Sequence, residues 1–202
     1  MAQAVSVKSK CCAPQPILSS NTLNFCSNCG SDQIRLKVPE GDNRPRYCCD
    51  NCGMIHYQNP NMVVGCLPIY QDKILLCRRA IEPRKGYWNL PAGFLENGET
   101  ASEGALRETW EEAHARVDII RLHAVYDIPH VKQVYLFFLA NMPEPIFGSG
   151  PESLEVDLFS PEEIPFNDMA FTSSTYAIRQ YLAYKDKEFE GVHMGGYVPS
   201  KG

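Results

Sequence analysis

The segment GFLENGETASEGALRETWEEAHA, residues 93–115, is the most informative part of this chain. Within it, Thr100 is followed three residues later by Glu103. This spacing is a capping box, in which each side chain accepts a hydrogen bond from the other residue's backbone N–H group. The pair marks the beginning of a helix, and the apolar spacing behind it extends to His114. We therefore predict one well-defined helix over residues 100–114.

Three carboxylates lie on one stripe of this predicted helix. At 100° per residue, Glu111 and Glu112 lie about 60° and about 40° to either side of Glu108. Like charges at this spacing repel one another by about a few tenths of a kcal/mol per pair, and Arg107 is the only cation inside the segment. A solvated helix face usually alternates its charges instead. We expect divalent cations to relieve the repulsion, and oxygen ligands favour Mg²⁺ or Mn²⁺ over zinc or copper.

Six residues of the segment match the fixed positions of the Nudix box: a glycine, five residues, a glutamate, seven residues, Arg-Glu, an apolar residue, any residue and Glu-Glu. The six are Gly93, Glu99, Arg107, Glu108, Glu111 and Glu112. The chain therefore resembles the Nudix hydrolases. The resemblance implies an α/β protein, a Nudix α/β/α sandwich with a mixed sheet, and the irregular succession of predicted strands and helices agrees with a mixed sheet.

Two positions depart from the box. Thr109 occupies a position that prefers a larger aliphatic residue, and His114 occupies the position of a glycine that ends the helix. That glycine is expected to have a positive φ, so a histidine there costs about 1 kcal/mol of backbone strain. The departure concerns the loop after the helix, and we do not expect His114 to be catalytic.

The resemblance also implies a reaction and a set of roles. The reaction is hydrolysis of a nucleoside diphosphate linked to another moiety, by metal-assisted attack of water on phosphorus. By position, Glu111 and Glu112 are metal ligands together with the backbone carbonyl of Gly93, and Glu108 is a ligand or the general base. Which carboxylate takes the proton from water varies within the family, so the catalytic base stays open.

The same resemblance implies roles for further acidic and basic positions. Glu99 and Arg107 are expected to hold the preceding loop against the helix through an ion pair. The segment PESLEVDLF, residues 151–159, resembles a late strand on which related enzymes carry another acid. We expect Glu155 to be an additional metal ligand, with Glu152 as the second choice. The alternative is that both are surface acids at a strand edge.

Four of the nine cysteines form a repeated pattern near the N-terminus. Cys26 and Cys29 make one C-x-x-C-G knuckle, and Cys49 and Cys52 make another, with 19 residues between the two. This spacing predicts a tetrahedral four-cysteine zinc site in a small zinc ribbon. A disulfide pair is the alternative. Cys48 is the one rival to Cys49, but it would break the match between the two knuckles.

Composition and segment lengths limit the classes of protein that the chain can belong to. The net charge of −5 argues against a broad basic surface that grips nucleic acid. The longest apolar run has seven residues, against roughly 20 for a membrane span, so no membrane segment is expected. The predicted organisation is a disordered tail at 1–21, a zinc ribbon at 22–59, a Nudix hydrolase domain at 60–185 and a C-terminal tail at 186–202.

The N-terminal region indicates the cellular compartment in which the protein is expected. It lacks the apolar core of a signal peptide, so a reducing cytoplasm is expected, with a short organelle transit segment as the alternative. The ribbon region carries four basic and four acidic residues, so we expect no nucleic-acid partner. A homodimer is an expectation from the family alone.

Sequence outside the Nudix box limits the choice of substrate. The ribbon, the segment YQNPNMVVGCL and the segment GPESLEVDLFSPEEIPFNDMAF are similar to ribbon-bearing Nudix enzymes related to plant chloroplast FAD and ADP-ribose pyrophosphohydrolases. The signature SQPWPFP of NADH pyrophosphatases is missing. We therefore expect a Mg-dependent pyrophosphohydrolase that cleaves FAD or ADP-ribose to release AMP. The alternatives are an NADH pyrophosphatase or other nucleotide-diphosphate hydrolase and, in another class, a nucleotide sensor or RNA-binding module.

Aromatic and basic residues outside the box are candidates for the rest of the substrate site. Those able to stack on a purine or flavin ring are Tyr87, Trp88, Tyr126, Tyr135 and Phe171. Those able to meet phosphate oxygens are Arg78, Arg79, Arg84 and Lys85. Core packing is the alternative for each aromatic residue, and a solvated loop is the alternative for the basic ones.

Overall fold

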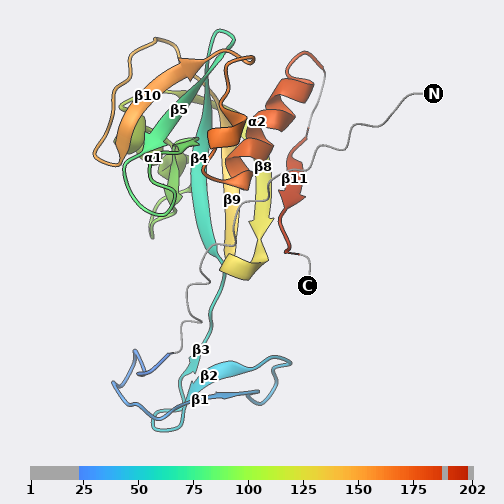
Figure 1. The fold of residues 1–202 in the computed structure, drawn as a ribbon. Helices are drawn as coiled ribbons and strands as arrows, with labels where there is room; N and C mark the ends of the chain where they lie inside the picture. The colour runs from blue at the N-terminus through green and yellow to red at the C-terminus, as the bar shows by residue number, and fades with distance from the viewer. Residues whose placement is uncertain (1–22, 188–190, 200–202) are drawn as a thin grey trace, which may run out of the picture. The chain divides into compact units, whose positions relative to one another are not determined.

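The computed structural model describes residues 23–187 and 191–199. The chain divides into two compact units, Met1–Gln58 and Asn59–Gly202 (Figure 1). The N-terminal tail predicted at 1–21 lies outside the described residues. Because the two units are separately compact, each is described by itself.

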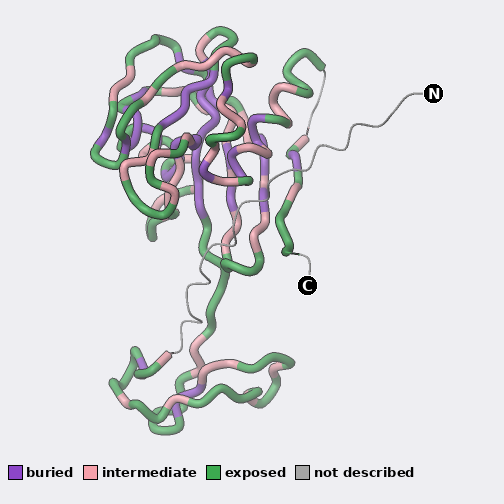
Figure 2. The backbone as a smooth tube through the Cα atoms, viewed as in Figure 1, coloured by how far each residue is buried: buried purple, intermediate pink, exposed green. Residues whose placement is uncertain are grey.

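The first unit contains a three-stranded antiparallel sheet. Its strands are β1 (Ile34–Lys37), β2 (Arg46–Cys49) and β3 (Ile55–His56), in that order across the sheet. Most of this unit is exposed (Figure 2). The buried apolar residues within its described part are three cysteines, Cys26, Cys48 and Cys49. With no larger apolar core, the unit has the composition of a module that relies on a bound metal for stability.

The second unit is built on an eight-stranded mixed sheet. Six strands run in the order β10 (Ser153–Phe159), β5 (Lys73–Arg79), β4 (Asn61–Tyr70), β9 (Gln133–Asn141), β8 (Asp118–Ile128) and β11 (His193–Gly196). Off this path, β6 (Trp88–Asn89) pairs with β5 and β7 (Ala92–Phe94) pairs with β4. The pairs β4–β9 and β8–β11 are parallel and the others are antiparallel, which confirms the predicted mixed sheet.

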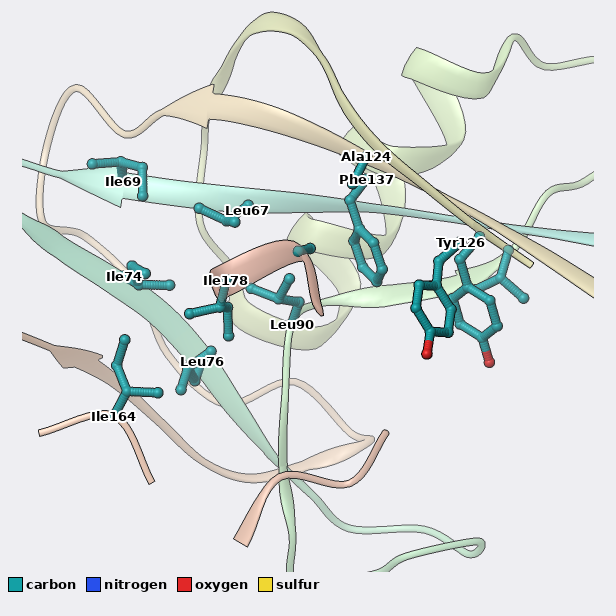
Figure 3. Close-up of a cluster of buried hydrophobic side chains, with 13 residues drawn as sticks. Leu67, Ile69, Ile74, Leu76, Leu90, Ala124, Tyr126, Phe137, Ile164 and Ile178 are labelled. Carbon is teal, nitrogen blue, oxygen red and sulfur yellow. The ribbon is translucent and has the colours of Figure 1, made fainter. Parts of the chain in front are cut away.

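Helices cover both faces of this sheet. They are α1 (Ala101–Ala113) and α2 (Thr172–Tyr184), with short 3₁₀ turns η1 (Pro129–Val131) and η2 (Phe166–Asp168). Successive residues of β4 point to opposite faces, so Val64 packs with Ala105 of α1, whereas Leu67 packs with Ile178 of α2 (Figure 3). The predicted α/β/α sandwich is therefore confirmed. Neither helix of the described residues is long and apolar enough to span a membrane.

The C-terminal region differs from the prediction. Residues 186–202 were expected to form a tail, but they include β11, which extends the sheet parallel to β8. Its sequence is HMGG, and glycine is depleted in strands, so local propensity gave no signal. The strand is secured by α2: the Tyr176 hydroxyl donates to the Met194 carbonyl at 2.8 Å, and the Tyr176 ring lies where a Cβ on Gly195 would be.

Candidate active site

The start of α1 follows the predicted capping box. The backbone N–H of Glu103 donates to Thr100 Oγ1 at 3.2 Å, and the backbone N–H of Thr100 donates to Glu103 Oε2 at 2.8 Å. Two of the N–H groups that a helix start leaves without partners are thereby satisfied. The acidic stripe begins two turns later, so its place on the sheet is set by this fixed start.

The end of α1 confirms the positive φ expected at position 114. This residue has φ 47° and ψ 27°, in the left-handed region, and its N–H donates to the Trp110 carbonyl at 2.8 Å. The His114 ring packs against the Trp110 ring with centroids 5.5 Å apart. The ring therefore lies with an exposed aromatic residue of the helix rather than with the acidic stripe.

Arg107 lies at the centre of the acidic residues. Its guanidinium is within 2.8 Å of Glu99, 2.7 Å of Glu108 and 3.0 Å of Glu111. The Glu99 pair is the one that the resemblance implied. The other two pairs show that one arginine offsets part of the repulsion along the stripe, which the sequence led us to expect from divalent cations alone.

The same arginine fastens the loop before α1. Arg107 also donates to the Phe94 carbonyl at 3.1 Å, and Glu99 accepts from the backbone N–H of Glu96 at 2.8 Å. The hydrogen bond from Arg107, reinforced by that N–H, lowers the pKa of Glu99 to about 2. The loop and the helix are therefore joined by a carboxylate that stays ionised.

Gly93 of β7 makes room for the carboxylate of Glu108. A Cβ on residue 93 would lie 2.3 Å from Glu108 Cδ, closer than any real contact. A side chain there would displace Glu108 from the β7 backbone, which explains the glycine in physical terms. Burial raises the pKa of Glu108 even though Arg107 acts in the opposite direction.

Glu112 is the buried acid of the stripe, with only 7% of its surface exposed. Burial, followed by the charge of Glu108, raises the pKa of Glu112 to about 8, while the nearby Arg79 and a hydrogen bond from the backbone of Ala92 oppose the rise. A carboxyl group in this position is protonated at neutral pH until a cation arrives to compensate its charge. Its environment is therefore suited to a metal ligand.

The oxygen donors of the stripe fit a hard divalent cation. Carboxylates of Glu108, Glu111 and Glu112, with the carbonyl of Gly93, would hold it, and such ligands suit Mg²⁺ or Mn²⁺. Among the described residues, three or more His, Cys, Asp or Glu side chains bring their ligand atoms within 4.8 Å of one another only at the four cysteines. The carboxylates of the stripe are therefore not gathered as closely as the thiols. In this structure Glu108 and Glu111 instead form ion pairs with Arg107.

A glycine-containing loop closes the far end of α1. The N–H groups of Gly148 and Gly150 donate to the carbonyls of Ala113 and Glu112 at 2.8 and 3.0 Å, which satisfies the open end of the helix. A Cβ on Gly150 would lie 1.7 Å from the Glu111 carbonyl oxygen. Only glycine permits this close approach, so the loop is fixed against the helix immediately behind the acidic stripe.

The structure separates the two candidates for the additional acid. Glu152 follows the glycine loop, and its charge raises the pKa of both Glu108 and Glu112. Glu155, the first choice, instead pairs with the exposed Arg78 at 3.3 Å on the neighbouring strand. A metal-binding role for Glu155 stays a prediction, while the electrostatics favour the second choice, Glu152.

The four cysteines of the first unit come together as predicted. Their Sγ atoms all lie within 4.8 Å of one another, with Cys26 and Cys52 separated by 3.6 Å and Cys29 and Cys49 by 3.7 Å. Four sulfurs around a tetrahedral zinc with bonds of about 2.3 Å would be about 3.8 Å apart. The thiols therefore fit a zinc ion, and Cys48 is not part of the cluster.

The two knuckles have the same local geometry. Gly30 and Gly53 have φ of 73° and 75°, and the N–H of each donates to the carbonyl of the first cysteine in its knuckle, at 2.8 and 2.9 Å. Hydrogen bonds from the Met54 backbone and the Asn28 amide lower the pKa of Cys52 to about 6. Because zinc binds the thiolate, these donors prepare a sulfur for the metal.

An acidic helix stripe on an α/β/α sandwich, with a four-thiol ribbon before it, defines a class of metal-dependent hydrolase. The family described as NUDIX domain matches residues 59–180, and the family described as Nudix N-terminal, the Nudix zinc ribbon, matches residues 24–58. The chain belongs to the Nudix hydrolase family, in its zinc-ribbon-bearing branch.

A solved relative supports this assignment along most of the chain. A Nudix hydrolase from Nitrosomonas europaea is 48% identical with a TM-score of 0.81, covering 87% of this chain and 99% of the relative. This likeness includes much more of the chain than the box alone.

Three curated relatives have more specific names. An ADP-ribose pyrophosphatase from Methanocaldococcus jannaschii is 29% identical, over 64% of this chain and 78% of its own. Nudix hydrolase 19, chloroplastic, from Arabidopsis thaliana is 35% identical over 52% of this chain and 23% of its own. The NAD-capped RNA hydrolase NudC from Chromobacterium violaceum is 32% identical over 58% of this chain and 42% of its own. The last two relatives are thus much longer than the matched region.

Proposed function

We propose that the second unit hydrolyses the diphosphate of an ADP-containing nucleotide, either FAD or ADP-ribose, and releases AMP with Mg²⁺ or Mn²⁺ as cofactor. The observation that carries this proposal is the buried Glu112 beside Glu108 on a helix stripe fixed by Arg107. The ADP-ribose pyrophosphatase among the relatives supports the substrate class. The absence of the NADH pyrophosphatase signature supports the choice within that class.

Different residues of the chain have different roles in this reaction. Divalent cations held by the acidic stripe would neutralise the diphosphate and lower the pKa of a coordinated water. Arg107 pairs with both Glu108 and Glu111 and also donates to the Phe94 carbonyl of β7, which restrains these two acids near that strand. Glu108 and Glu152 are the candidates for accepting a proton from the attacking water. Glu108 belongs to the acidic stripe, the charge of Glu152 acts on it, and neither is bonded to the loop as Glu99 is.

The candidate aromatic residues differ in accessibility. Tyr126 and Tyr135 are buried in the core cluster, and Trp88 packs edge-on against Phe159 with ring centroids 4.8 Å apart. Tyr87 is exposed, and Phe171 is half-buried beneath an arginine. We propose Tyr87 and Phe171 as the rings available to a purine or flavin, because the other three are already used in packing.

A second candidate function is hydrolysis of nicotinamide dinucleotides. It is favoured by the NAD-capped RNA hydrolase NudC among the relatives, which matches 58% of this chain. The chemistry at the diphosphate would be the same, and the difference would lie in recognition of the distal group. A homodimer and a cytoplasmic location stay predictions.

A substrate panel distinguishes these proposals. The purified protein is incubated separately with FAD, ADP-ribose and NADH under Mg²⁺ and then Mn²⁺, and AMP is measured by chromatography. We expect turnover of FAD or ADP-ribose that exceeds turnover of NADH, and no turnover by Glu112→Gln. Preference for NADH would support the second candidate, and no AMP from any of the three would contradict the proposed function.

A further inference from the structure

Two histidines meet in the interior of the second unit, where the C-terminal strand joins the sheet. His123 of β8 is only 1% exposed, and His193 of β11 is buried beside it, with the ring centroids 5.0 Å apart. Two tyrosines of α2 complete the cluster: the Tyr181 ring lies 6.4 Å from His123, and the Tyr184 ring lies 5.0 Å from His193. The contacts of the histidine pair therefore join β8, β11 and α2 (Figure 1).

The hydrogen bond of His123 fixes the protonation state of its ring. Nε2 lies 2.9 Å from the Ala177 carbonyl oxygen, and because a carbonyl only accepts, Nε2 carries the proton. Nδ1 is buried, and within residues 23–187 and 191–199 it has no hydrogen-bond partner. A second proton on Nδ1 would place an unsatisfied donor and a net charge in the interior. The site is therefore built for the neutral ring of His123.

The surroundings of the histidine pair also oppose a positive charge. The charged or titratable groups that face the pair are Arg121 of β8, Tyr181 and Tyr184 of α2, and Lys187, which lies over the Tyr184 ring. β9 contributes Phe137 and Phe138 opposite this part of β8. Burial lowers the pKa of His123 to about 4, and His193 and Arg121 act in the same direction, against the hydrogen bond from Nε2.

β11 is the element that is held least firmly against a charge on His123. It is a four-residue strand, HMGG, at the end of the described sheet, and it pairs with β8 alone. Beyond this pairing it is held by side-chain hydrogen bonds to the Gly191 and Met194 carbonyls, at 2.9 and 2.8 Å. In contrast, α2 contributes Ile178 to the main core, and β8 is paired with β9 along its length.

We propose that His123 is an acid-sensitive latch for the C-terminal strand: its neutral ring holds residues 193–196 against β8, and protonation of the ring releases them. After release, water reaches the ring and both N–H groups of the imidazolium find acceptors. Release also uncovers the hydrogen-bonding edge of β8 at residues 124–127. The latch is separate from the acidic stripe and does not depend on the proposed function.

The direction of the pH dependence follows from the two states of the ring. A released histidine has a pKa of about 6.5, above the value of about 4 in the docked state. The released state therefore binds more protons between these two values. Docking of β11 is favoured fully above about pH 6.5, and the preference is lost as pH falls toward 4.

Hydrogen exchange of the whole chain, followed by mass spectrometry, tests the latch. Protection of the amides of residues 191–197 is measured at pH 7.5 and pH 5, after correction for the intrinsic exchange rate at each pH. We expect protection to fall by about 10- to 30-fold, the ratio that pKa values of about 6.5 and about 4 give. Amides of β4 report global unfolding and are expected to lose less. Unchanged protection of β11, an equal loss in β4, or β11 amides without protection at pH 7.5 would overturn the proposal.

Two variants assign the effect to one ring. His123→Gln cannot be protonated but keeps an N–H donor for the Ala177 carbonyl, so its β11 protection is expected to change less than about 3-fold between the two pH values. The matched control is His130→Gln. His130 contacts the same segment, with its ring 5.5 Å from that of Tyr197, but it is exposed, so the wild-type pH dependence is expected to remain. The reverse pattern in these two variants contradicts the latch.

A measurement on the wild-type protein decides the question if His123→Gln does not fold. Nuclear magnetic resonance reports the protonation of the His123 ring and the docking of β11 in the same sample. At pH 6 we expect the docked protein to have a neutral His123 ring protonated on Nε2, although a released ring is mostly charged at this pH. A ring that becomes charged near pH 6.5 while the β11 amide signals stay unchanged would overturn the proposal.

Discussion

The protonation of Glu112 is set by burial before any metal binds. Its folded pKa of about 8 lies above the ordinary value of 4.5, so the apo protein is stabilised by this group below about pH 4.5 and loses that contribution as pH rises through about 8. A bound divalent cation reverses the preference, because it stabilises the ionised form. The protonation state of Glu112 is therefore coupled to the binding of a divalent cation.

Glu99 shows the opposite linkage. Its folded pKa of about 2 lies below the ordinary 4.5, so its contribution to stability is present above about pH 4.5 and is lost as pH falls toward 2. We expect Glu99→Gln to have a lower free energy of unfolding than wild type at pH 6.5, with the difference shrinking at pH 3.5. Urea unfolding at both pH values measures it. The exposed Glu162→Gln serves as control, and a difference that does not change with pH would contradict the ion-pair account.

Single substitutions at Glu152 and Glu155 test which of these two acids takes part in the reaction. Because Glu152 acts electrostatically on two acids of the stripe and Glu155 is paired with Arg78, we expect Glu152→Gln to lower kcat about 10-fold or more. Glu155→Gln is expected to change kcat by less than about 3-fold. The comparison uses saturating nucleotide and Mg²⁺, and a larger loss in Glu155→Gln would restore the first choice.

The residues of the box were predictable because six of them fall at fixed offsets, and their roles followed from the resemblance. The pairs that Arg107 makes with Glu108 and Glu111, and the burial of Glu112, were not predictable. Rotation around a helix axis gives the direction of a side chain, but burial depends on β7 and on a loop about 40 residues further along the chain. No local pattern carries that information.

At the scale of one helix, the histidine that ends α1 predicts a stability gain. His114→Gly removes the left-handed strain and is expected to raise the free energy of unfolding by roughly 0.5–1 kcal/mol. His114→Ala is the matched control, since it loses the same contact with Trp110 but keeps a Cβ at positive φ. Denaturant unfolding of both variants checks the expectation. A glycine variant no more stable than the alanine variant would show that the strain is absent.

Helices and strands with a clear local sequence pattern were predicted more accurately than those without one. Two apolar runs at residues 62–70 and 73–79 flank a short polar turn, a pattern that predicts a hairpin, and they match β4 and β5 to within a residue. The helical spacing of aromatic and apolar residues predicts a closing helix at residues 174–184, and α2 begins two residues earlier, at Thr172. The strand β11 was missed because its pairing depends on β8 and on Tyr176 rather than on its own residues.

At the scale of the whole molecule, the two units should respond differently to metal removal. The buried apolar residues of the described first unit are cysteines, so removal of a zinc ion bound there would remove its main source of stability, whereas Asn59–Gly202 has its own core. We expect a strong chelator or Cys29→Ser to abolish bound zinc and expose residues 23–58 to proteolysis, while the second unit stays resistant.

Metal analysis and limited proteolysis measure both effects. Cys48→Ser is the control, because Cys48 lies outside the four-thiol cluster and its loss should leave zinc bound. Digestion of both units at the same rate after zinc removal would contradict their independence. The ribbon was predictable from spacing alone, since a repeated C-x-x-C pattern has few other uses.

Binding of Mn²⁺ observed by electron paramagnetic resonance tests the central claim most directly. The protein and its Glu112→Gln variant, which keeps the shape of the side chain but loses its charge, are titrated with Mn²⁺ at pH 8 in the presence of ADP-ribose. The account predicts protein-bound Mn²⁺ for the wild type and at least about 10-fold weaker binding for the variant. Equal binding by both proteins, or none by the wild type, would contradict the assignment of the acidic stripe as the metal site of a hydrolase.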